Sequence, residues 1–166
     1  MASFIPNIIS RWNHNLDGLN YSPMEYYTLV EAGIKRRNFP DVSVKRITLF
    51  QGGLFSSKRE YLRVSRNDLT FDICAAPFGT CFFISWWFGE RLGVLKSLIA
   101  RIPYLGPFII NISKPKTYFQ LDTQNMFTSA VHACVLSAID EISKDKGIRG
   151  LSDMERTPQG SAKGQS

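Results

Sequence analysis

The residues that could carry acid–base, nucleophilic or metal chemistry are few and scattered. The chain has two histidines, His14 and His132, and three cysteines, Cys74, Cys81 and Cys134. His132 and Cys134 lie two positions apart, and helical residues at that spacing do not share a face, so we expect no metal site there. The odd number of cysteines without a CxxC pair indicates small buried thiols in a reducing compartment. A disulfide between Cys74 and Cys81 across a tight turn is the disfavoured alternative.

The sequence contains none of the common motifs for covalent or phosphoryl-transfer catalysis. GxSxG and HExxH are both absent, and these motifs would place an activated serine on a turn or two zinc ligands on one helix face. Gly52-Gly53 lacks the strand–GxGxxG–helix context in which backbone amides hold a phosphate, so it indicates a hairpin turn. We therefore expect a non-enzymatic protein that uses no metal and no cofactor.

Positive charge is concentrated in one part of the chain. The net charge is +6, and residues 35–66 alone contribute +7. Such a field attracts nucleic acid, anionic lipid or an acidic protein, and the alternative is a solvated face that only aids solubility. Within it, Arg59, Tyr61 and Arg63 alternate on one face of a strand. Apart from Tyr61, the aromatic residues are concentrated in 78–88, away from the cations of 35–66, so the sequence disfavours nucleic acid as the partner.

The strands and helices that must position these residues indicate an α+β domain. Strands at 42–50, 58–66, 69–75 and 80–88 form a four-stranded antiparallel meander, with a bulge near Lys45–Arg46 and a turn at 76–79. A two-residue turn at 67–68 places Arg63 opposite Asp72 and Val64 opposite Phe71. Charge pairs and apolar pairs then match together, which predicts this register.

One helix is predicted before the meander in the sequence and one after it. Together the two helices can cover one face of the sheet. The first begins at a capping box, Ser22 to Glu25, and ends before Pro40. The second occupies 117–146 and stops at Gly147. Residues 1–21 show no sustained period and predict a short helical turn or an arm. We expect a single domain over 1–150 and a disordered polar tail over 151–166.

The most apolar stretch determines the functional prediction. No charged residue occurs between Ile73 and Gly89, and alternation places aromatic side chains on both faces of the second strand there. An apolar helix-loop insertion follows at 92–112, broken by Pro103 and Pro107. A spanning helix needs about 20 uninterrupted apolar residues, so a re-entrant element or one that lies at a membrane interface fits the pattern better than a spanning helix does. An amphipathic helix and a loop that close over the sheet are the alternative.

We therefore expect a module that associates peripherally with a membrane, alone or as a subunit of a larger assembly. The expected membrane or partner contacts are Phe78, Trp86, Trp87, Leu98, Ile99, Phe108 and Ile109, although the two tryptophans also fit plain core packing. The alternative function is a soluble protein-interaction or nucleic-acid-binding module that uses Arg59, Tyr61 and Arg63. The N-terminal sequence lacks a secretory signal, which predicts residence in the cytoplasm, either free or at the inner face of a membrane.

Overall fold

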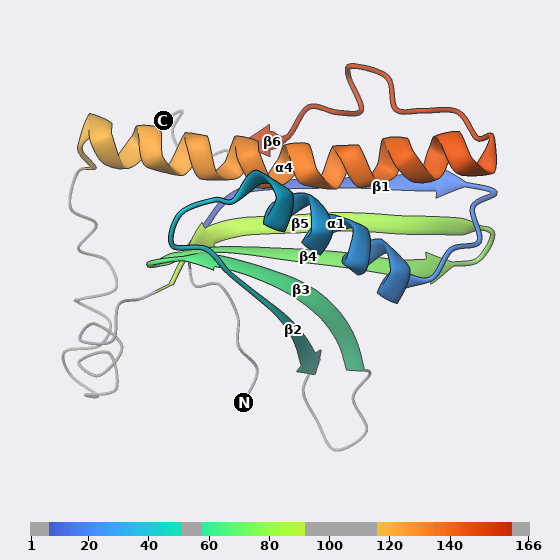
Figure 1. Ribbon diagram of the computed structural model, residues 1–166, viewed down its shortest axis with the longest axis horizontal. Helices are drawn as coiled ribbons and strands as arrows, with labels where there is room; N and C mark the ends of the chain where they lie inside the picture. The colour runs from blue at the N-terminus through green and yellow to red at the C-terminus, as the bar shows by residue number, and fades with distance from the viewer. Residues whose placement is uncertain (1–6, 51–57, 92–115, 161–166) are drawn as a thin grey trace, which may run out of the picture.

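In the described part of the chain, one antiparallel sheet carries two helices on one face (Figure 1). The structure is a computed structural model that describes residues 7–50, 58–91 and 116–160. The elements in chain order are β1 (Asn7–Asp17), α1 (Pro23–Arg37), β2 (Ser43–Phe50), β3 (Lys58–Arg66), β4 (Leu69–Phe78), β5 (Cys81–Glu90), α4 (Tyr118–Lys146) and β6 (Gln159–Gly160). The strand order is β2-β3-β4-β5-β1-β6. The α+β class is confirmed, but the sheet is larger than a four-stranded meander. The apolar insertion lies outside the described residues.

The β3–β4 hairpin has the register that the sequence predicts. Across the turn at 67–68, Val64 pairs with Phe71 and Arg63 pairs with Asp72. The apolar pair faces the helices and is fully buried. The charged pair faces the other way and forms two hydrogen bonds of 2.6 Å, from Arg63 Nε to Oδ1 and from Nη2 to Oδ2 of Asp72. A two-residue turn and matching cross-strand pairs are therefore sufficient to fix this register.

The predicted bulge in β2 is wrong. β2 pairs with β3 without interruption from Ser43 to Phe50. The sequence indicated a change of face because Arg46 falls in the column of residues that points toward the helices. Its guanidinium is accommodated there by α1, where Glu31 Oε1 accepts from Arg46 Nε at 3.0 Å. A partner on the helix thus lets a cation occupy this side of the sheet without a break in the ladder.

The turn between β4 and β5 lies later than predicted. β4 extends through Pro77 to Phe78, and the turn consists of Gly79 and Thr80. Gly79 has φ +61°, a left-handed conformation that glycine adopts without a Cβ clash. This register pairs Cys74 with Ser85 rather than with Cys81, and all three cysteines are free. The disfavoured disulfide does not form.

β1 is the strand that sequence reasoning missed. It lies between β5 and β6 and pairs with β5 along nearly its whole length, with Trp12 opposite Trp86 and Leu16 opposite Phe82. Asparagine is depleted in strands, and the NHN sequence around His14 concealed the alternation of Trp12 and Leu16. The pairing partner is also distant in sequence, so no local turn signals the contact.

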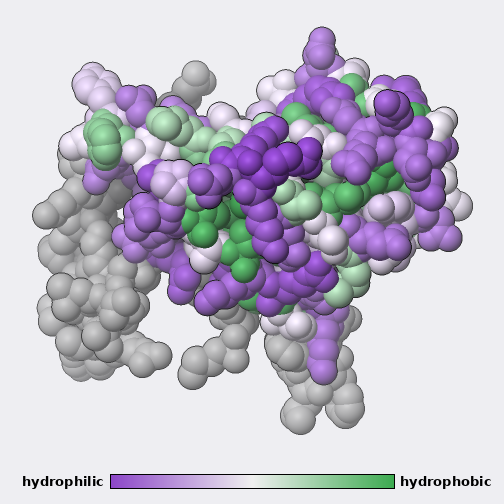
Figure 2. Space-filling view, viewed as in Figure 1, coloured by the Kyte–Doolittle hydropathy of each residue, from purple (hydrophilic) through white to green (hydrophobic). Residues whose placement is uncertain are grey.

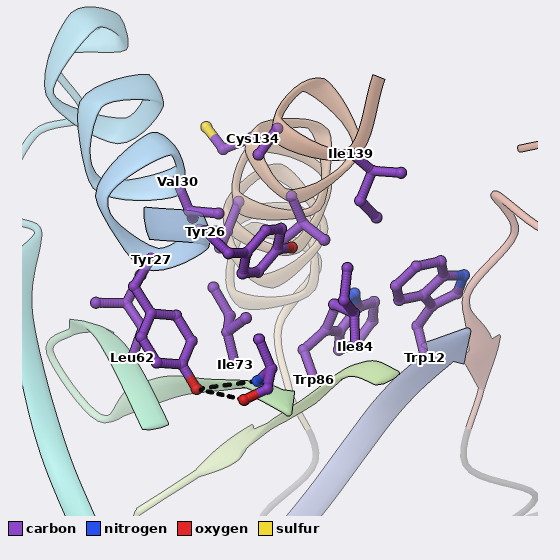
Figure 3. Close-up of a cluster of buried hydrophobic side chains, with 14 of the residues drawn as sticks. Trp12, Tyr26, Tyr27, Val30, Leu62, Ile73, Ile84, Trp86, Cys134 and Ile139 are labelled. Atoms are coloured by element: carbon purple, nitrogen blue, oxygen red, sulfur yellow. Dashed lines mark hydrogen bonds between the residues drawn. The ribbon is translucent and has the colours of Figure 1, made fainter. Parts of the chain in front are cut away.

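α1 begins and packs as expected, but its capping box does not form. Ser22 occupies the N-cap position without a side-chain hydrogen bond, and only its backbone carbonyl accepts, from the amide of Tyr26. Tyr27 anchors the helix on the sheet: its hydroxyl accepts from the amide of Ala75 at 2.9 Å and donates to the carbonyl of Glu60 at 2.9 Å. Figure 3 shows Tyr27 reaching from α1 to the sheet, where its hydroxyl is hydrogen-bonded. Both partners are backbone groups, so the contact depends on sheet geometry.

α4 supplies most of the remaining core. Its N-cap Thr117 forms a complete capping box with Gln120, and Gly147 ends the helix in a left-handed conformation. The predicted stripe is buried and consists of Phe127, Val131, Val135, Ala138 and Ile142. Figure 3 shows side chains from α1, α4 and the sheet meeting in one layer that includes Trp12, Trp86 and Ile139.

The chain after α4 returns to the sheet. Leu151 is buried, the indole N–H of Trp12 donates to the carbonyl of Glu155 at 2.6 Å, and β6 pairs with β1. Residues 151–160, which the sequence assigned to a disordered tail, therefore make tertiary contacts. Their polar composition did not indicate this, because apart from Leu151 the contacts use backbone groups and ion pairs. Residues 161–166 lie outside the described part of the chain.

Candidate functional site

The expected membrane contacts are not brought together by the sheet. Phe78 is 78% exposed at the β4–β5 turn. Trp86 is fully buried against α4 and is thereby removed from any contact surface. Trp87 is partly exposed on the opposite face of the sheet. The other four expected contacts, Leu98, Ile99, Phe108 and Ile109, lie outside the described residues.

The two ends of the undescribed stretch 92–115 lie side by side. Glu90, at the end of β5, accepts from Lys116 Nζ at 2.9 Å and also from the side-chain amide of Gln124 on α4. Arg91 donates its backbone amide to the carbonyl of Asp68 at 2.8 Å. The chain thus leaves the described structure and re-enters it at the same end of the sheet. Phe78 is the last residue of β4 and borders the β4–β5 turn, which lies at the other end of the sheet (Figure 1).

Large apolar side chains are exposed at this same end, on the first turns of α4. Tyr118 is 88% exposed, Phe119 80% and Met126 69%, and Leu121 is also exposed. Figure 2 shows hydrophobic surface beside this end of α4. We call the surface formed by Tyr118, Phe119, Leu121 and Met126 the α4 apolar patch. Monomeric proteins seldom expose contiguous apolar surface without a binding role.

Helix length explains why these turns are uncovered. α4 has 29 residues and β4 has 10, so the helix is about 44 Å long and the strand about 33 Å. The buried residues of α4 begin only at Gln124. The first turns of α4 therefore project beyond the ends of the strands. Sequence reasoning missed the patch because the buried stripe was traced from Phe127 onward, although the aromatic pair directly after Thr117 was a visible signal.

No protein-family model, no curated protein and no solved structure matches the chain. The residues that the structure describes hold no group of three or more His, Cys, Asp or Glu side chains arranged to bind a metal ion. Among the same residues, no helix is long and apolar enough to cross a membrane.

The predicted basic residues share one face of β3, as expected. Arg59, Tyr61 and Arg63 point away from the helices, since Leu62 and Val64 between them are buried in the core. Arg59 is exposed, Tyr61 is partly exposed, and Arg63 is buried in its pair with Asp72.

Cys74 lies next to this basic group. Burial raises the pKa of its thiol, and this outweighs the opposite influence of the nearby Arg59, Tyr61 and Ser85. The thiol therefore stays protonated at neutral pH. It is a polar packing group and not an activated nucleophile.

A buried polar contact connects α4, the sheet and the C-terminal segment. The indole N–H of Trp86 donates to Nδ1 of His132 at 3.0 Å, and Nε2 of His132 donates to the carbonyl of Arg156 at 2.7 Å. Arg156 in turn forms an ion pair with Asp140 at 2.6 Å. Burial lowers the pKa of His132. The neutral ring satisfies both contacts, whereas a protonated Nδ1 would face the indole N–H. The histidine is thus structural.

Acidification is therefore expected to destabilise the fold through His132. Because its pKa is lower in the folded protein than the 6.5 of an exposed imidazole, the unfolded chain binds the proton more tightly. The stabilisation is complete above pH 6.5 and is lost as the pH falls through the folded-state pKa. Urea unfolding at pH 7.5 and pH 5 measures the loss. His132→Gln keeps a neutral acceptor and donor and should show a smaller pH dependence. An unchanged pH dependence in this variant would assign the effect to other groups.

Proposed function

We propose that the protein is a non-enzymatic module that associates peripherally with a membrane. The membrane contact is the end of the molecule where α4 begins and β5 ends. The observation that carries the proposal is the α4 apolar patch, which lies beside the points where the chain leaves and re-enters the described structure around the apolar sequence 92–112. The exposed apolar side chains of α4 therefore lie beside Arg91 and Lys116, the described residues that flank this apolar sequence.

The composition of this end favours lipid over water. Transfer of Tyr118 and Phe119 from water into an interface removes two large apolar surfaces from solvent. Full burial of a side chain as large as Phe is favourable by about 1.5–3 kcal/mol. Tyrosine is enriched at membrane interfaces because its ring is apolar and its hydroxyl stays hydrated. Arg91 and Lys116 flank the entry and exit points. Arg91 is exposed and can keep its charged end among lipid headgroups, whereas Lys116 is paired with Glu90.

Vesicle flotation of the full chain tests the proposal. We expect the protein to float with phosphatidylcholine vesicles, to bind more strongly when phosphatidylglycerol is included, and to stay bound after a high-salt wash. Carbonate should release it, as it releases peripheral proteins. Protein that stays in the dense fraction with both vesicle compositions would contradict membrane association and leave a protein partner as the occupant of the patch.

A further inference from the structure

The face of the sheet opposite the helices carries charged and aromatic side chains. The proposed membrane contact does not use them. Cross-strand pairing aligns these residues in rows. One row crosses five strands and consists of Lys45, Arg63, Asp72, Trp87 and Arg11. A second row holds Cys74, Ser85 and Asn13, and a third holds Ala76, Phe83 and Asn15. Leu49 and Arg59 pair with each other on β2 and β3. We call this surface the open face.

The open face is positively charged. Arg11, Lys45 and Arg59 are exposed, and none of them forms an ion pair with a carboxylate of the described residues. Arg63 is neutralised by Asp72. The three exposed cations therefore present a field that attracts a polyanion.

Aromatic rings lie between these cations. Trp87 and Phe83 stand on β5 and Tyr61 on β3, and all three are partly exposed. The guanidinium of Arg11 lies 5.9 Å from the centroid of the Trp87 ring, a cation–π contact that orients the ring. The sequence separates the aromatic segment from the basic segment, but the sheet interleaves them because β4 and β5 pair between β3 and β1.

Small side chains separate the rings. Ser85 lies between Phe83 and Trp87 along β5, and Cys74 lies beside Ser85 on β4. Both small residues are buried, whereas the rings around them reach solvent. On a strand, residues four apart lie about 13 Å from one another. The rings are thus spaced as separate stacking positions, with a polar floor between them.

We propose that the open face binds single-stranded nucleic acid. Exposed rings on a sheet stack on unpaired bases, and cations beside them hold the phosphates. Charge alone would also suit an acidic protein, but that partner does not require aromatic rings set between the cations. A membrane surface is a poor match because Asn13, Asn15 and Ser85 make this face polar. The site is independent of the α4 apolar patch, which lies on the first turns of α4 at one end of the molecule.

Fluorescence anisotropy with labelled oligothymidylate tests the proposal on the full chain. We expect binding that weakens steeply with salt, because phosphate contacts release counterions. Trp87→Leu should weaken binding about tenfold, and Arg59→Gln should reduce the salt slope by about one. Trp12 and Trp86 are buried, so quenching of tryptophan emission on binding reports on Trp87 directly.

Matched variants separate this site from other surfaces. Lys144→Gln removes an exposed cation from the last turn of α4 and should leave the affinity unchanged, as should the Tyr118→Ser/Phe119→Ser variant. Each of three results would overturn the proposal: absence of binding at low salt, equal affinity of Trp87→Leu and the parent, or competition by phosphatidylglycerol vesicles for the open face. The last result would assign the cations to lipid headgroups.

Discussion

Reversal of one charge in the Arg63–Asp72 pair is expected to lower the free energy of unfolding by about 3–5 kcal/mol. The two side chains are buried and joined by two hydrogen bonds of 2.6 Å. Asp72→Arg would leave two cations facing each other at a desolvated position of the sheet. Urea unfolding measures the loss. Arg63→Asp should cost a similar amount, and the double reversal should recover a large part of it because the pair is restored with opposite polarity.

Lys45→Gln is the control for this experiment. Lys45 pairs with Arg63 across the strands but is exposed, so its replacement should change stability by no more than about 0.5 kcal/mol. An equal loss of unfolding free energy in the single and double reversals would show that the two residues do not interact. The charged pair would then not contribute to the register of β3 on β4.

Removal of the aromatic residues of the α4 apolar patch is expected to weaken vesicle binding about 100-fold. Tyr118→Ser/Phe119→Ser deletes two side chains that are 88% and 80% exposed. If each gains about 1.5 kcal/mol on entering the interface, the sum of about 3 kcal/mol corresponds to roughly that factor. The melting temperature should not change, because neither side chain contributes to the core. Vesicle co-sedimentation across lipid concentrations measures the partition coefficient.

Phe78→Ser is the matched control. Phe78 is as exposed as Phe119 but lies at the opposite end of β4, so its loss should leave vesicle binding intact. If Phe78→Ser instead abolishes binding while Tyr118→Ser/Phe119→Ser retains it, the membrane contact lies at the β4–β5 turn and the assignment to α4 fails.

Local signals in the sequence predicted one hairpin register and one helix face, although the bulge in β2, the position of the β4–β5 turn and the capping box of α1 were predicted wrongly. A two-residue turn between alternating runs determined how Arg63 and Asp72 pair, and the apolar stripe from Phe127 to Ile142 identified the covered face of α4. These features depend on residues close in sequence, whose spacing directly reflects strand or helix geometry.

Features that depend on distant segments were not predicted. β1 belongs to the sheet only because β5 pairs with it, and Glu155 and Arg156 contact the core through their backbone carbonyls. The same limit affected the candidate sites. The overhang of α4 follows from the length of the helix relative to the strands, and the mixture of rings and cations on the open face follows from strand order. Neither feature can be derived from a single segment of the sequence.

The most direct test of the membrane assignment is the depth of one side chain in the bilayer. Phe119→Trp in a Trp87→Phe background places a fluorophore on the α4 apolar patch, while Trp12 and Trp86 remain buried. Vesicles with brominated acyl chains should quench this emission and shift it to the blue. Phe78→Trp in the same background should be unaffected. Quenching of neither variant, or of the variant at position 78 alone, would contradict membrane association through the start of α4.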